Sequence, residues 1–83
     1  MTKQVLIGPV AYRWLQRHRF VSEEVIIGVV LHCPHSERKY TDDDDRFQVV
    51  FKRRKNSKFV KVTLWVQERQ DSFFVGKIHS EKA

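Results

Sequence analysis

Two alternating segments joined by a short polar turn constrain this chain more than any other feature of its sequence. In 46–53 and again in 58–67, apolar and polar side chains alternate with a period of two, the pattern of a strand with two unlike faces. A turn at 54–57 joins these segments, and a second turn at 69–72 leads to a last strand at 73–80. The sequence therefore predicts a three-stranded antiparallel meander.

One face of the predicted middle strand is aliphatic and the other is mixed. The aliphatic face carries Val60, Val62, Leu64 and Val66, and the opposite face carries Phe59, Lys61, Thr63 and Trp65. Helices must cover the aliphatic face, which leaves the mixed face open. Two orientations of the last strand are possible, and we favour the one with Phe74 and Ile78 inward. This orientation places Lys77 and His79 beside Lys61 and Trp65.

Two helices are expected before the meander. Apolar residues recur at helical spacing from Pro9 to about His18, and a second helix from Glu23 to about His32 is predicted by Ser22 as its N-cap. This second segment is rich in β-branched residues, so a buried strand is the alternative. Short strands are also possible at 5–7, where the other reading is an apolar arm, and at 38–40.

We therefore expect an α+β fold, with two N-terminal helices packed on one face of a three- to four-stranded antiparallel meander. The 83 residues allow one domain, 1–83, with an arm or short strand at 1–8 and a frayed tail at 81–83. An apolar fraction of 41% is that of a folded chain rather than a disordered one.

The composition also bears on location and cofactors. The one cysteine, Cys33, excludes an intramolecular disulfide, and neither a signal peptide nor an apolar run of about 20 residues is present. We expect a cytoplasmic protein without a membrane partner. No Gly-rich phosphate loop or nucleophile elbow occurs, so no cofactor is predicted.

The positive charge is segregated along the chain. The net charge is +6, and the seven basic residues of 46–61 have no acidic neighbour within that segment, whereas Asp42 to Asp45 directly precede it. This pattern favours a polyanionic partner, RNA or another nucleic acid. Basic surfaces also serve solubility alone, and that alternative stays open.

Three groups of residues are candidates for nucleic-acid contacts. The hairpin tip predicts a phosphate clamp, or else a soluble turn that protects the sheet edge, and the first helix adds a second basic patch. Trp65 is placed to stack on an unpaired base. The basic candidates are Lys52, Arg53, Arg54, Lys55 and Lys58 at the tip, and Arg13, Arg17 and Arg19 near the first helix.

The same open face offers catalytic chemistry without a metal. The 2′-hydroxyl of RNA is an internal nucleophile, so cleavage needs a proton-transfer group such as His79 and cations such as Lys61 and Lys77. The run 32–35, with two histidines and Cys33, lacks the second ligand pair of a zinc site, and 42–45 lacks the spacing of a calcium loop. We therefore predict no metal.

Several short motifs resemble one known family. The segment Arg19-Phe20-Val21-Ser22-Glu23-Glu24-Val25, a helix closing before Pro34, and strands of the type Phe-x-Val-Val and Lys-Val-Thr-Leu resemble short prokaryotic domains grouped with the barnase and RelE-like superfold. That superfold contains toxin ribonucleases of toxin–antitoxin pairs. The resemblance spans Val10 to His79 and implies RNA held on an open sheet face, near Lys61, Trp65, Lys77 and His79. The chain departs from the family at Val10 and Ala11, where a histidine is often found, and at Phe20, where a small residue is common.

Three functions thus follow as hypotheses. The first is a metal-independent endoribonuclease, and the second is a nucleic-acid-binding module without catalysis. The third is a protein-interaction module, a homodimer or the partner of another protein, that uses Trp65, Phe59 and Phe73 as exposed aromatic contacts.

Overall fold

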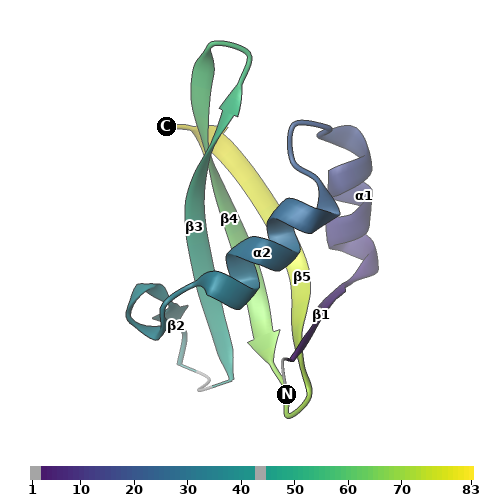
Figure 1. Ribbon diagram of the computed structural model, residues 1–83, viewed down its shortest axis with the longest axis vertical. Helices are drawn as coiled ribbons and strands as arrows, with labels where there is room; N and C mark the ends of the chain where they lie inside the picture. Colours follow the sequence, from purple (N-terminus) through teal and green to yellow (C-terminus); the bar gives the residue numbers. More distant parts are fainter. Residues whose placement is uncertain (1–2, 43–44) are drawn as a thin grey trace.

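The protein folds as a five-stranded mixed sheet with two helices on one face, as the computed structural model of residues 3–42 and 45–83 shows (Figure 1). The strands lie in the order β1-β5-β4-β3-β2. Along the chain the elements are β1 (Gln4–Ile7), α1 (Pro9–Arg17), α2 (Glu23–His32), a 3₁₀ turn η1 (His35–Glu37), β2 (Lys39–Tyr40), β3 (Arg46–Lys55), β4 (Lys58–Glu68) and β5 (Ser72–Lys82).

The meander is confirmed, but the predicted three- to four-stranded antiparallel sheet is too small and of the wrong type. The segment at 4–7 is a strand rather than an arm, and β1 pairs in parallel with β5, placing Val5 opposite Phe73. At the other edge β2 pairs with β3. The sheet is mixed because β1 and β5 run in the same direction, joined by the helices and the meander between them.

Both helices form where the sequence predicts them. Pro9 opens α1, and the face with Ala11 and Leu15 is buried against the sheet. The Ser22 hydroxyl caps α2 by accepting a hydrogen bond from the Val25 N–H at 3.3 Å. The helix predicted for this β-branched segment is therefore confirmed, and its inward face buries Ile26 and Val30.

The hairpin of β3 and β4 is longer than predicted, and so is β5. The strands run to Lys55 and from Lys58, so only Asn56 and Ser57 turn the chain, and Asn56 has φ of 57°. Asparagine tolerates this left-handed conformation better than most residues. The predicted frayed tail at 81–83 is wrong for 81 and 82, since β5 continues to Lys82, which pairs with Val60.

A β-bulge in β5 corrects the predicted orientation of that strand. Trp65 pairs with Lys77 but Val66 pairs with Val75, so Gly76 is the extra residue. Before the bulge Phe73 and Val75 are buried, and after it Ile78 is buried. The prediction that Phe74 faces the core is therefore wrong, and so is the prediction of an exposed Phe73, which is 6% exposed.

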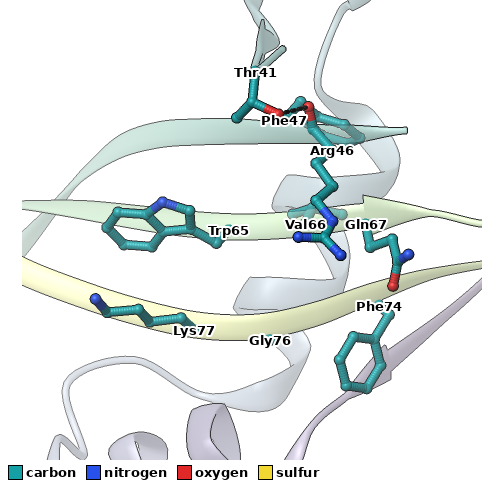
Figure 2. A pocket seen from close by; sticks show the side chains of 9 residues that line it. All are labelled: Thr41, Arg46, Phe47, Trp65, Val66, Gln67, Phe74, Gly76 and Lys77. Atoms are coloured by element: carbon teal, nitrogen blue, oxygen red, sulfur yellow. Dashed lines mark hydrogen bonds between the residues drawn. The ribbon is translucent and has the colours of Figure 1, made fainter. Parts of the chain in front are cut away.

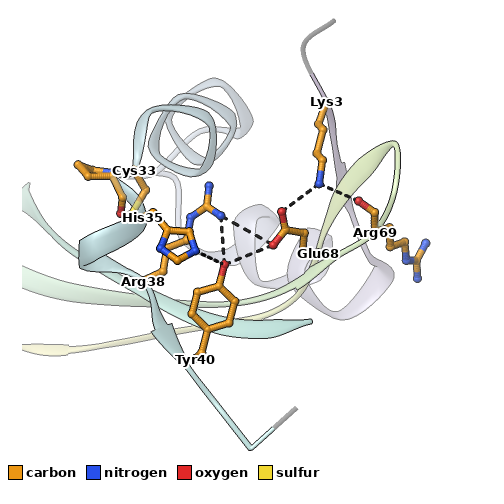
Figure 3. A network of polar contacts seen from close by, with 8 residues as sticks. Lys3, Cys33, His35, Arg38, Tyr40, Glu68 and Arg69 are labelled. Atoms are coloured by element: carbon orange, nitrogen blue, oxygen red, sulfur yellow. Dashed lines mark hydrogen bonds and ion pairs between the residues drawn. The ribbon is translucent and has the colours of Figure 1, made fainter. Parts of the chain in front are cut away.

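A polar network joins β1, β2 and the end of β4 on the helix side of the sheet (Figure 3). The Glu68 carboxylate accepts from Lys3 Nζ at 2.9 Å and from the Tyr40 hydroxyl at 3.3 Å. Arg38 Nη1 donates to the same hydroxyl and lies 3.8 Å from Glu68, while its guanidinium stacks over the rings of Phe47 and Phe73. The hydrogen bond from Lys3 is the main cause that lowers the pKa of Glu68.

Replacing Glu68 by glutamine should lower the thermal stability of the protein, since the ion pairs with Lys3 and Arg38 are lost. Because the folded-state pKa of Glu68 is lowered, its stabilising effect is present above the ordinary glutamate pKa and disappears as the pH falls through the lowered value. The Tm difference between the wild type and Glu68→Gln should thus be present at neutral pH and should close as the pH falls below the ordinary glutamate pKa and through the lowered one. Glu37→Gln, at an exposed position, is the control, and a constant difference over the whole range would contradict this account.

A candidate nucleic-acid interface on the open sheet face

The face of the sheet turned away from the helices is called the open face here. The alternation of each strand and the observed register define its members. From the three central strands these are Arg46, Gln48, Val50, Lys52 and Arg54 of β3, Phe59, Lys61, Thr63, Trp65 and Gln67 of β4, and Phe74, Gly76, Lys77, His79 and Glu81 of β5. The edge strands add Gln4 and Leu6 of β1 and Lys39 of β2.

The open face is predominantly cationic. Its strands β3, β4 and β5 carry five lysine or arginine side chains and one carboxylate, Glu81, which accepts a hydrogen bond from Lys61 Nζ at 2.9 Å. The Asp45 carboxylate, just before β3, accepts from the Gln67 amide at the edge of this face. That hydrogen bond is the main cause that lowers the pKa of Glu81, and both partners are exposed to solvent. An uncovered face of this composition attracts polyanions.

The four candidates of the predicted active face lie on adjacent strands. Trp65 is paired with Lys77, Thr63 with His79, and Lys61 with Glu81, so the three pairs follow one another along β4 and β5. The Lys77 ammonium lies 4.9 Å from the centre of the Trp65 ring, a cation–π contact. His79 is exposed between these neighbours.

The hairpin tip divides its cations between the two faces. Lys52 and Arg54 belong to the open face, opposite Lys61 and Phe59. Arg53 Nε donates to the Phe20 carbonyl at 3.4 Å, and Lys55 lies 5.1 Å over the Phe20 ring, so both cover the loop between the helices. Lys58 is exposed at the start of β4, and the alternation of that strand places it on the helix side of the sheet. The cations of the tip therefore lie on both faces of the hairpin rather than on one.

The arginines near the first helix lie apart from Trp65. Arg13 and Arg17 are exposed on α1, whose Ala11 and Leu15 pack into the core on the other side of the sheet. Arg19 follows in the loop after α1. The structure thus brings the candidates of β3, β4 and β5 together and leaves those of α1 on the helix layer.

A hollow of about 510 Å³ lies on the open face at the bulge (Figure 2). It is lined by Thr41, Arg46, Phe47, Trp65, Val66, Gln67, Phe74, Gly76 and Lys77. Gly76 contributes no side chain, so the surface is recessed between Trp65 and Phe74. Sequence reasoning missed Arg46, Gln67 and Phe74 as site residues. A glycine inside a strand, which often marks a bulge, was the available signal.

The ring of Phe74 is held in place from several sides. A Cβ built on Gly8 would lie 2.6 Å from Phe74 Cζ, so the ring packs directly on the backbone that opens α1. The Gly8 N–H donates to the Val75 carbonyl at 2.9 Å, and the Arg69 guanidinium lies 4.5 Å from the centre of the Phe74 ring. One wall of the hollow is therefore fixed by Gly8, which lies between β1 and α1, and by Arg69 of the β4–β5 turn.

The described Cys, His, Asp and Glu side chains, which were considered as metal ligands or nucleophiles, do not lie together in one site. Within 3–42 and 45–83, no three His, Cys, Asp or Glu side chains are placed to hold a metal ion, and Asp43 and Asp44 lie outside the described residues. Cys33 is partly buried, its Sγ lies 3.5 Å from the Pro34 carbonyl, and burial raises the pKa of its thiol. The raised pKa disfavours the thiolate and hence nucleophilic chemistry at Cys33.

Among the described residues, neither α1 nor α2 is long and apolar enough to cross a membrane. No protein-family model, curated protein or solved structure matched the chain.

Two glycine substitutions test the geometry of the Phe74 wall. Gly8→Ala should destabilise the protein by about 1–3 kcal/mol, because the new methyl group meets Phe74 at 2.6 Å and the Val75 carbonyl at 3.3 Å. Gly76→Ala should change stability by less than about 1 kcal/mol, since its methyl group meets nothing closer than 3.5 Å. Urea unfolding measures both, and equal effects would show that Phe74 does not pack on Gly8.

Proposed function

We propose that this protein binds single-stranded RNA on the open face. The observation that carries the proposal is the gathering of five cations, Trp65 and Phe74 on the uncovered face of β3, β4 and β5, where these strands carry one carboxylate, Glu81. Cations neutralise phosphates, and aromatic rings stack on bases that are not already paired.

The arrangement favours an unpaired strand over a double helix. Trp65 and Phe74 border a hollow in the sheet, where a base can enter only after it has left its own stack. The base edges of an RNA duplex are closed to such contacts in its deep, narrow major groove. The resemblance of short sequence motifs to uncharacterised prokaryotic domains grouped with the barnase and RelE-like superfold is the reason for proposing RNA rather than single-stranded DNA.

The two halves of the hairpin tip give a charge-matched test of this proposal. The double variant Lys52→Ala/Arg54→Ala removes two open-face cations, and Arg53→Ala/Lys55→Ala removes two cations that contact Phe20. Only the first should weaken binding strongly, and it should reduce the slope of log K against log salt by about 1.4, or about 0.7 for each phosphate contact. Native-gel retardation of a mixed-sequence RNA at several salt concentrations measures the slope.

Both variants carry the same net charge, so an equal loss of affinity would indicate attraction to the whole protein rather than to the open face. Wild-type protein that does not retard RNA at low salt would refute the proposal. A dimer in solution that is indifferent to RNA would favour the protein-interaction alternative.

A second function, metal-independent cleavage, is favoured by the position of His79. It lies on the open face with Lys77 and Glu81 as its same-face neighbours along β5, and Lys61 is paired with Glu81. In this proposal the imidazole takes the proton of the 2′-hydroxyl, whose oxygen forms a bond to phosphorus. The bond from phosphorus to the 5′-oxygen breaks, that oxygen takes a proton from water, and the imidazolium returns its proton to solvent, while Lys61 and Lys77 stabilise the charge on the phosphorane.

Cleavage, where it occurs, should depend on His79 and not on divalent metal. With chelator present, His79→Ala should slow cleavage of a mixed-sequence RNA by at least about 10²-fold, the usual effect of losing an acid–base group. His32→Ala, an exposed histidine at the end of α2, is the matched control and should retain the wild-type rate. Denaturing gels measure both rates. Intact RNA with every variant would leave binding without catalysis, and equal cleavage by the wild type and His79→Ala would place the chemistry elsewhere.

A further inference from the structure

We infer that the hollow above Gly76 is a binding site for one nucleotide unit, with the base between Trp65 and Phe74 and the phosphate held by Arg46 and Lys77. This inference rests on the proposed function, because it assigns the place on the open face where a single nucleotide of the RNA is recognised.

The shape and lining of the hollow fit a planar base. Its volume of about 510 Å³ lies within the range of small-molecule sites, about 300–1,000 Å³. Trp65 and Phe74 stand on two sides of the recess at Gly76, and Val66 contributes to its lining. Stacking on an aromatic ring contributes about 1–3 kcal/mol for each base, and it requires little of the base beyond a flat surface.

The charges at the edge of the hollow fit an anionic group attached to that base. The Arg46 side chain extends across the hollow toward Gln67, and Lys77 lies alongside Trp65 (Figure 2). Neither cation forms an ion pair with another residue of 3–42 or 45–83. A guanidinium and an ammonium at two ends of a largely apolar recess are complementary to a base that carries a phosphate.

The free protein already holds the walls of this site. Phe74 is packed on Gly8, and the Gln67 amide is fixed at both ends, donating to Asp45 Oδ2 at 3.3 Å and accepting from Arg69 Nη2 at 3.4 Å. The Lys77 ammonium covers the Trp65 ring, so a stacking base would displace it. The displaced ammonium remains near enough to the ring to meet the phosphate of the same nucleotide. The fixed positions of Phe74 and Gln67 lower the entropic cost of binding.

Titration of the ¹⁵N-labelled protein with AMP, GMP, CMP and UMP tests the inference, and inorganic phosphate is the control for simple anion binding. We expect saturable shifts at the Trp65 indole N–H and the Gly76 amide with at least one nucleotide. Gly76→Val, which fills the recess from a strand position without a left-handed φ, should weaken this binding at least about 10-fold. Val10→Ile adds bulk at an exposed position of α1, on the helix layer, and should leave the binding unchanged.

Gly76→Ala, whose methyl group fits without a clash, keeps the test valid if the valine variant does not fold, and it should give an intermediate affinity. RNA retarded equally by the wild type and the Gly76 variants, with no nucleotide shifts at Trp65 or Gly76, would overturn the inference and leave the proposed function standing. Chemical-shift changes on adding a nucleotide, in a protein that does not retard RNA, would support the nucleotide site and refute the proposed function. Shifts that inorganic phosphate reproduces in full would also overturn it, since the base would then contribute nothing.

Discussion

The extra residue in β5 is the constraint on which both faces of the sheet depend. In a regular strand, Phe73, Val75, Lys77 and His79 would share one face, so a core that buried the first two would bury the charged pair as well. Burying an unpaired ammonium is costly. The bulge at Gly76 reverses the alternation, so that Phe73, Val75 and Ile78 all reach the core while Lys77 and His79 reach solvent.

The same bulge connects the hollow to the start of the chain. It turns Phe74 outward, and the ring then rests on Gly8, the residue between β1 and α1. Gly8 in turn donates to Val75, one residue before the bulge. The parallel pairing of β1 with β5 is therefore more than an added edge, because it positions the backbone that supports one wall of the hollow.

The sequence predicts what depends on local pattern and misses what depends on distant pairing. The alternation of β3 and β4, the Ser22 cap and the end of α2 before Pro34 follow from neighbouring residues alone. The four residues of β1 give no indication that their partner begins at Ser72. The predicted turn at 54–57 is too wide, because consecutive basic residues are as typical of a loop as of an exposed strand end. Among the described non-glycine residues, Asn56 alone takes a left-handed φ, and it marks the actual turn. For the site, Lys61, Trp65, Lys77 and His79 were placed together by strand alternation, whereas Arg46 and Gln67 gain their place only through the hollow that the bulge opens.

The charged residues that stabilise the fold and the cations proposed to attract a ligand lie on opposite sides of the sheet. On the helix side, the Glu68 carboxylate accepts a hydrogen bond from Tyr40 and forms ion pairs with Lys3 and Arg38. These two cations stabilise the fold. On the open face, Lys61–Glu81 is the one ion pair between described residues. The other cations of this face form no ion pair with a described residue, so their charge remains available to a binding partner. Added salt therefore screens the exposed cations of the open face more than the partly buried Glu68 network, which responds mainly to acid. Under the proposed RNA binding, this arrangement predicts release of the RNA at high salt while the fold stays intact.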